Sequence, residues 1–188
     1  PADRVVVTGA QSFDRWFDRQ PSRDRASFAR HVGLPDDRPY VLWVCSALFP
    51  NSPSEAAFVV RWASHLRQSP DPRLRNVRIL IRPHPSRTKE WATVDWASVG
   101  NVALHGSNPI DEHARADYFD ALYHSAAVVG LNTSAFIEAG IVGRPVLAVL
   151  PEEFRSNQEG TLHFRYLTST DGGLLTIART LDEHATQL

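Results

Sequence analysis

The chain has 188 residues, which is enough for one domain with a hydrophobic core or for two very small ones, and we expect one. Hydrophobic residues make up 43% and charged residues 22% of the sequence, values that are ordinary for a globular protein and exclude a largely disordered chain. The formal net charge of −1 provides no field that would attract nucleic acid or an anionic membrane, so neither is expected as a partner.

Cysteine content and hydropathy indicate the compartment. The single Cys45 excludes an internal disulfide and a cysteine metal site, and its apolar neighbours predict a buried thiol in a reducing environment. No apolar run approaches the roughly 20 residues of a membrane span, and the N-terminus lacks a signal-peptide pattern. We therefore expect a cytoplasmic protein without a transmembrane segment. The sequence has no methionine, from which we expect a chain processed or excised from a longer protein.

The first 36 residues contain short predicted elements. Residues 5–9 (VVVTG) are typical of a short strand that ends in a glycine turn, and an aromatic-rich helical fragment follows. A second helix is predicted over residues 24–32, because Gly33 suits the left-handed position after a last turn and Pro35 prevents continuation.

From residue 37 onward, apolar runs alternate with helical patterns. Strands are expected at residues 39–45, 77–81, 101–104, 127–131 and 145–150, with a last strand or helix start at 174–177. Helices are expected at residues 52–67, 118–124, 135–142 and 163–167, with an irregular or helical segment between Trp91 and Trp96. The first of these helices opens with Ser-Pro-Ser-Glu, in which Glu55 would complete a capping box. The alternation predicts a three-layer, Rossmann-like α/β sandwich with about six mainly parallel strands.

The stretch from Ala126 to Leu150 is the one around which we expect the fold to be organised. Two apolar runs without alternation, as in strands covered on both faces, enclose a helix that starts at Asn132-Thr133-Ser134 and ends at Gly143. The free N–H groups and the positive dipole at the helix start make an anion site. Ligands of an open parallel sheet bind beyond the carboxyl ends of its strands, so we expect a nucleotide phosphate at this turn.

Glu138 is the unusual residue of that helix, because its neighbours leave almost no polar face. It follows Ser134 by four residues and so lies one turn below it on the same face, too far along for a capping box. One interpretation is a carboxylate that accepts hydrogen bonds from sugar hydroxyls, as acidic residues do in dinucleotide folds. The alternative is a partly exposed glutamate that the helix dipole stabilises.

Three polar features fall at expected strand ends: Ser46, the Arg82-Pro83-His84-Pro85 turn, and the Asn132-Thr133-Ser134 turn with Glu138. Prolines on both sides of His84 restrict the backbone, so its imidazole is presented from a stiff turn and could donate to a phosphate oxygen. The alternative is an exposed loop histidine without a function.

Known cofactor and metal motifs are missing. The sequence has no GxGxxG, GxxxxGK[ST] or GxSxG pattern. His113, His124 and His163 show no ligand spacing that implies a metal, so no metal and no cofactor are expected.

Several motifs together resemble the C-terminal, donor-binding domain of a GT-B fold glycosyltransferase. His84-Pro85 followed by a Thr/Ser motif is similar to bacterial sialyltransferases, capsule Kdo transferases and CDP-glycerol glycerophosphotransferases. The matching segments are VVVTGAQSFD at 5–14, GLPDDRPYVLWV at 33–44, and NTSAFIEAGIVGRPVLAV at 132–149. The resemblance implies phosphate or nucleotide contacts for His84, Thr133 and Ser134, and a ribose-binding segment at 138–139 and 143–146.

The resulting hypothesis is a transferase half-enzyme that binds a nucleotide-activated sugar donor. Residues 1–36 would be a linker from a missing N-terminal domain, and residues 37–188 the donor-binding domain. His84 would be catalytic, stabilising charge on the departing phosphate, while the acceptor site and catalytic base would lie in the missing domain. The donor-binding residues would be Ser46, Arg82, His84, Thr133, Ser134 and Glu138. Alternatives are an isomerase similar to UDP-N-acetylglucosamine 2-epimerase, a CDP-glycerol glycerophosphotransferase, and a non-catalytic nucleotide-binding module.

Overall fold

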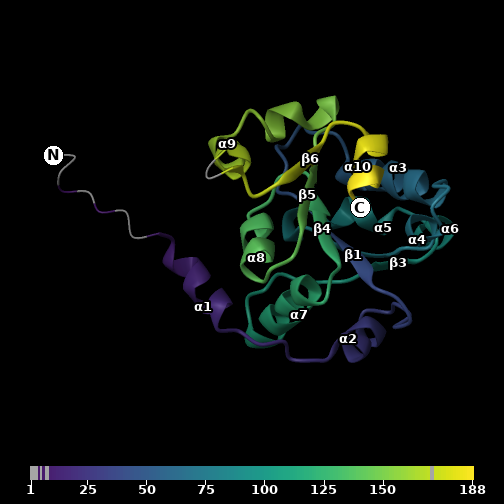
Figure 1. Ribbon diagram of the computed structural model, residues 1–188, viewed down its shortest axis with the longest axis horizontal. Helices are drawn as coiled ribbons and strands as arrows, with labels where there is room; N and C mark the ends of the chain where they lie inside the picture. The colour runs from purple at the N-terminus through teal and green to yellow at the C-terminus, as the bar shows by residue number, and fades with distance from the viewer. Residues whose placement is uncertain (1–3, 5, 7–8, 170–171) are drawn as a thin grey trace.

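A parallel β-sheet forms the centre of the protein (Figure 1). The computed structural model describes residues 4, 6, 9–169 and 172–188. Within these residues, the sheet has six strands in the order β3-β2-β1-β4-β5-β6, and each neighbouring pair is parallel. The strands are β1 (Tyr40–Val44), β2 (Arg78–Arg82), β3 (Val102–Leu104), β4 (Ala127–Gly130), β5 (Val146–Val149) and β6 (Thr176–Ala178).

Helices connect successive strands, as parallel pairing requires. The α-helices are α1 (Asp14–Phe17), α2 (Arg25–His31), α3 (Glu55–Arg67), α4 (Pro72–Arg75), α5 (Thr88–Ala92), α6 (Trp96–Val99), α7 (Glu112–Tyr123), α8 (Ala135–Ile141), α9 (Leu162–Ser169) and α10 (Leu181–Gln187). Three 3-10 helices are also described: η2 (Gln11–Phe13), η3 (Pro85–Arg87) and η4 (Glu152–Asn157). The predicted three-layer, Rossmann-like sandwich is confirmed.

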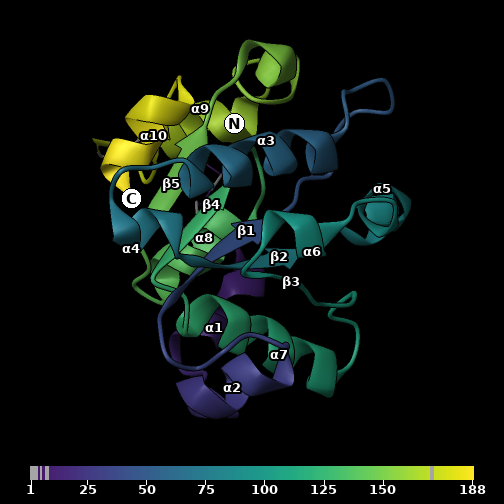
Figure 2. The same ribbon diagram turned by 90° about the vertical axis from the view of Figure 1, so that its right-hand side faces the viewer.

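Two hydrophobic clusters cover the two faces of the sheet, because successive strand residues point to opposite sides. Leu42 and Val44 of β1 pack with α1, α2, α7, α8 and α9, whereas Val41 and Trp43 pack with α3, α5, η4 and α10. Figure 2 shows α3 and α6 on one side of the sheet and α2 and α7 on the other. Both faces of β1 are buried, which explains its uninterrupted apolar sequence.

The start of α3 differs from the prediction. The cap is Ser54, whose hydroxyl accepts a hydrogen bond from the Ala57 N–H at 3.2 Å. Glu55 makes no capping box: its carboxylate turns into the protein and accepts hydrogen bonds from Trp43 Nε1 at 3.1 Å and from the Ser46 N–H at 2.9 Å. Burial raises the pKa of Glu55 to about 8.

Helix α7 is longer than predicted and helix α10 was not predicted at all, and each begins at a side-chain cap. Helix α7 begins six residues before residue 118, at Glu112, because Asp111 caps it by accepting from the Ala114 N–H at 2.8 Å. Helix α10 was not anticipated and is capped by Thr180, which accepts from the Glu183 N–H at 3.1 Å.

The segment before residue 37 contributes to the core. Trp16 of α1 packs against Tyr118 and Phe119 of α7, with ring centroids 5.4 and 5.6 Å apart. Phe28 of α2 is completely buried on the same face of the sheet. Gly33, which follows the end of α2, has the expected left-handed conformation, with a φ of 80°. The short strand expected at residues 5–9 falls mostly outside the described residues.

The strand order places a topological switch between β1 and β4. From β1 the chain proceeds outward to β2 and β3 and then returns to β4 on the other side of β1. Crevices at such a point, beyond the carboxyl ends of the strands, are the usual ligand sites of open α/β sheets. In the part of the chain that the structure describes, none of the helices combines the length and the apolar character that a membrane crossing requires.

Candidate functional site

A cavity of about 240 Å³ lies beyond the carboxyl ends of β1, β2 and β4, at the switch point. It brings together five of the six residues that the sequence predicted for donor binding, with Ser46 outside the lining. The lining consists of Val44, Cys45, Arg82, Pro83, His84, Pro85, Ser107, Asn108, Pro109, Tyr118, Thr133, Ser134, Ala135 and Glu138.

His84 is held in one orientation by the turn that follows it. Its Nδ1 accepts a hydrogen bond from the Ser86 N–H at 3.3 Å and lies 2.7 Å from the Ser86 hydroxyl. Because Nδ1 is an acceptor, a neutral ring carries its proton on Nε2. Burial lowers the pKa of His84, which favours this neutral form near pH 7. The imidazole can therefore present an N–H group to an anionic ligand.

Arg82 supplies a positive charge that is almost fully buried, with 6% of the residue exposed. Its Nη2 donates to the Ser107 carbonyl at 2.6 Å, and its guanidinium lies 4.6 Å from the centre of the Tyr118 ring. Its Nη1 is buried without a hydrogen-bond partner among the described residues. Gly106 makes this packing possible, because a Cβ there would lie 2.4 Å from Nη1. The Arg82 guanidinium is thus a buried positive charge with one N–H group that has no partner among the described residues.

Glu138 and Tyr118 are coupled across α8 and α7. The Tyr118 hydroxyl donates a hydrogen bond to Glu138 Oε2. Burial raises the pKa of Glu138, while this hydrogen bond and the charges of Arg15 and Arg82 oppose the rise. Burial and the Glu138 charge also raise the pKa of Tyr118, so the phenol stays protonated as the donor. One oxygen of Glu138 therefore has a structural partner within the protein.

The turn before α8 also lines the cavity. Thr133 Oγ1 accepts a hydrogen bond from the Ala135 N–H at 3.3 Å, as expected for a capping residue. Ser134 stands at the cap position with an exposed side chain, and among the described residues its hydroxyl makes no capping bond. Gly130, at the end of β4, permits the close approach of the two central strands, because a Cβ there would lie 2.7 Å from the Val44 carbonyl oxygen.

Ser46 joins the two central strands and does not line the cavity. Its buried Oγ accepts a hydrogen bond from the Asn132 N–H at 3.1 Å. Its own N–H donates to Glu55. Ser46 therefore fixes the relative position of the carboxyl ends of β1 and β4.

Two parts of this site were not predicted from the sequence. No role at a site was predicted for Tyr118, which begins an expected helix, or for the loop Ser107–Pro109. The sequence signal for the loop is Gly106, a glycine just after an expected strand. In the structure this glycine has a φ of 130°.

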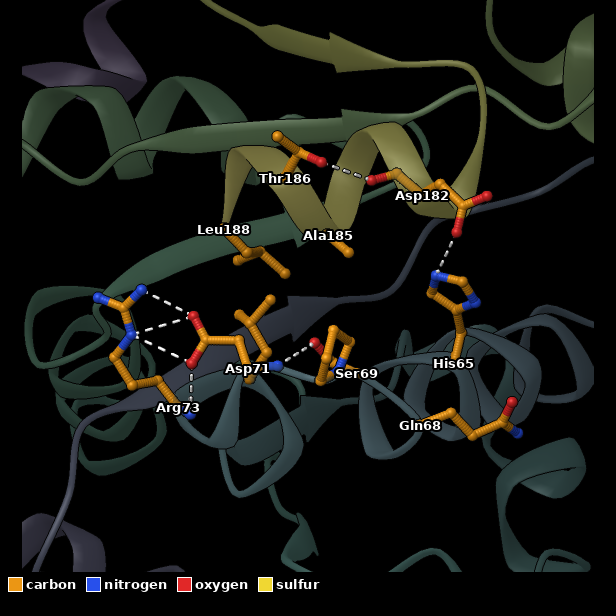
Figure 3. Close-up of a pocket in the computed structure, with 11 residues that line it drawn as sticks. His65, Gln68, Ser69, Asp71, Arg73, Asp182, Ala185, Thr186 and Leu188 are labelled. Atoms are coloured by element: carbon orange, nitrogen blue, oxygen red, sulfur yellow. Dashed lines mark hydrogen bonds and ion pairs between the residues drawn. The ribbon is translucent and has the colours of Figure 1, made fainter.

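A larger cavity of about 700 Å³ lies elsewhere, between α10 and the segment from α3 to α4 (Figure 3). The polar groups labelled there are largely paired: His65 Nε2 lies 3.1 Å from Asp182, and Arg73 forms an ion pair of 2.7 Å with Asp71. The α3–α4 connection leads toward the amino end of β2. We therefore assign the candidate site to the smaller cavity, which lies at the strand ends that bind ligands in this architecture.

Comparison with known proteins identifies the fold. No protein-family model matches the sequence, and no curated protein does so either. Similar solved structures include the ADP-heptose LPS heptosyltransferase II of E. coli, with a TM-score of 0.54 and 10% identity over 86% of this chain and 44% of that chain. The wall teichoic acid polymerase TagF gives a TM-score of 0.56 and 13% identity over 92% of this chain and 38% of that chain.

A glycosyl transferase of family 9 from Veillonella parvula is similar to the same degree, with a TM-score of 0.51 and 11% identity over 92% of this chain and 42% of that chain. The fold is GT-B-like. The chain spans less than half of the length of each of these structures, namely 44%, 38% and 42%.

Proposed function

We propose that this chain is the donor-binding half of a glycosyltransferase that transfers a sugar, or a sugar-like group, from a nucleotide-activated donor. The observation that carries the proposal is the cavity at the switch point of a GT-B-like sheet, lined by His84, Thr133, Ser134 and Glu138. The His-Pro and Asn-Thr-Ser motifs support the finer assignment to enzymes similar to sialyl-, Kdo- and CDP-glycerol-type transferases.

In this proposal, the polar groups of the cavity contact either the phosphates or the ribose of the donor. His84 Nε2–H and the hydroxyls of Thr133 and Ser134 would donate to the phosphate oxygens of the donor. Glu138 would accept hydrogen bonds from the ribose hydroxyls. Arg82, held against Tyr118 and Ser107, would contribute its positive charge.

The chemistry requires stabilisation of a leaving group. In sugar transfer the bond between the anomeric carbon and the phosphate oxygen breaks, and its electron pair departs with the nucleoside phosphate. Hydrogen-bond donors fixed near that oxygen stabilise the developing charge more in the transition state than in the ground state. His84 is suited to this role because its turn fixes it before the donor binds.

The size of the cavity supports a site that a second domain completes. Ligand pockets usually enclose roughly 300–1,000 Å³, and this one has about 240 Å³. We propose that residues 37–188 form the donor-binding wall and that residues 1–36 lead in from an N-terminal domain carrying the acceptor site and the catalytic base. The chain alone would then bind a donor nucleotide without turning it over.

Calorimetric titration with UDP, CDP, CMP, GDP and ADP tests the proposal, and we expect one preferred nucleotide. His84→Ala should weaken that nucleotide about tenfold to a hundredfold, the usual worth of a hydrogen bond to a charged group. The matching nucleoside, which lacks phosphate, should lose much less. His163→Ala, which changes an exposed histidine on α9, is the control. Equal heats for all five nucleotides, or equal losses for nucleotide and nucleoside, would refute the assignment.

A further inference from the structure

Three potential metal ligands meet outside the cavity although they are far apart in sequence. His31 closes α2, His105 follows β3, and Asp117 lies in the middle of α7. One ligand atom from each lies within 4.8 Å of the others. Such a cluster is invisible to motif analysis, since its members have no short spacing.

The distances within the cluster fit a tetrahedral centre. Asp117 Oδ2 lies 3.2 Å from His31 Nε2 and 3.5 Å from His105 Nε2. Zinc bonds to histidine nitrogen and carboxylate oxygen are about 2.0–2.2 Å long, which places neighbouring tetrahedral ligands about 3.3–3.6 Å apart. Both distances from the carboxylate oxygen to the imidazole nitrogens are therefore close to this spacing. The two rings, with centroids 5.0 Å apart and an angle of 72° between their planes, converge without stacking face to face.

A second group orients the carboxylate. Arg23 Nη1 donates to Asp117 Oδ1 at 2.7 Å, which leaves Oδ2 directed at the histidines. Hydrogen bonds of this kind fix metal ligands in many centres. The ligand set consists of two imidazole nitrogens and one carboxylate oxygen. That set suits zinc and similar transition metals, whereas magnesium and calcium prefer oxygen ligands.

We propose that His31, His105 and Asp117 bind a divalent transition metal ion of the zinc class. The fourth position would be taken by water or by His113, whose Nδ1 lies 3.9 Å from Asp117 Oδ2 on the exposed side of α7. The ion would join α2, the loop after β3 and α7. Because His105 directly precedes Gly106 and Ser107, the ion would also hold the loop that contacts Arg82. This proposal does not depend on nucleotide binding.

Calorimetric titration of the tag-free, chelator-treated chain with Zn²⁺ tests it. We expect one ion per chain with a low-micromolar or tighter dissociation constant, and an increase of a few degrees in Tm. Co²⁺ in the same site should give the visible absorption of a tetrahedral complex. A large excess of Mg²⁺ should leave both results unchanged.

Variants locate the ion. His31→Ala and His105→Ala should each weaken Zn²⁺ at least tenfold and abolish the tetrahedral Co²⁺ spectrum, whereas the exposed-site control His163→Ala should behave as wild type. Circular dichroism establishes folding before titration, and His105→Gln, which keeps a polar side chain beside Asp117, replaces any alanine variant that does not fold. The proposal would be overturned if the chain did not bind about one equivalent of Zn²⁺, or if the His105 variants bound Zn²⁺ as tightly as wild type. Displacement of Zn²⁺ by Mg²⁺ would also overturn it.

Discussion

The Tyr118 hydroxyl donates a hydrogen bond to Glu138 Oε2, so a side chain of α7 fixes a carboxylate of α8 beside the candidate donor site. The same tyrosine ring lies against the Arg82 guanidinium. One residue thus orients both charges of the cavity, which makes its removal informative.

Tyr118→Phe should lower the free energy of unfolding by about 1–3 kcal/mol, because the half-buried Glu138 carboxylate loses its partner. Glu138→Gln alone should have an effect of similar size, and the double variant should cost less than the sum of the two. Urea unfolding of the four proteins measures the coupling. Strictly additive losses would mean that the two side chains do not interact in solution.

Ribose recognition by Glu138 predicts a difference between two nucleotides. Glu138→Gln should weaken the preferred ribonucleotide about tenfold to a hundredfold and the deoxyribonucleotide less, since a missing hydroxyl removes part of the same interaction. Glu152→Gln, which changes an exposed glutamate outside the cavity lining, is the control and should retain the preference for ribose. Calorimetry with both nucleotides decides the matter, and unchanged affinities in Glu138→Gln would leave the carboxylate with a structural role alone.

Gly106→Ala should destabilise the protein through two costs. A Cβ would lie 2.4 Å from Arg82 Nη1 and 2.9 Å from Arg82 Cγ, and the φ of 130° is unfavourable for alanine. Gly33→Ala is the matched control, because its φ is also positive, at 80°, while no described atom lies within 4 Å of its Cβ position. We expect Gly106→Ala to lose about 1–3 kcal/mol more than the control in thermal or urea unfolding. Equal losses would contradict the close packing of Arg82 on this loop.

His184 should make the fold sensitive to acid. It is completely buried against Trp62, and burial lowers its pKa from 6.5 to about 4, with the nearby His65 adding to the effect. Below pH 6.5 the unfolded chain takes up a proton that the folded chain binds only near pH 4, so stability falls as the pH falls through this window. A pKa difference of this size corresponds to about 3 kcal/mol.

His184→Leu should remove that dependence and stabilise the protein near neutral pH, since both ring nitrogens lack partners among the described residues. Urea unfolding at several pH values, with exposed His163→Leu as the control, measures the difference in slope. Parallel pH profiles for wild type and His184→Leu would contradict the buried, neutral state.

Sequence patterns predicted the strands well because strands that are buried on both faces of a sheet consist almost entirely of apolar residues. Leu42 and Val128, which pair across the centre of the sheet, both lie in apolar runs without alternation. The predicted grouping of His84, Thr133 and Glu138 in one cavity followed from the same rule, since parallel strands end at one edge. Their roles in ligand binding stay predictions.

Side-chain direction explains what the patterns missed. Glu55 matched a capping box, but its carboxylate accepts hydrogen bonds from Trp43 Nε1 and the Ser46 N–H inside the protein. Tyr118 was indistinguishable from its packing neighbours, because a tyrosine in an apolar stripe does not reveal where its hydroxyl points. The meeting of His31 with His105 depends on how α2 docks, which local sequence does not specify.

The pairing of β1 with β4 also affects how the molecule assembles. Within the described chain, residues 40–104 build the half-sheet β1–β3 through two crossovers, and β4 joins it only by closing the long loop between Leu42 and Val128. His84 belongs to the first half and Glu138 to the second. A ligand that contacts both residues would bind only when β1 and β4 are paired, so its binding would stabilise that pairing. Ligand binding should therefore slow amide hydrogen exchange most strongly in β1 and β4.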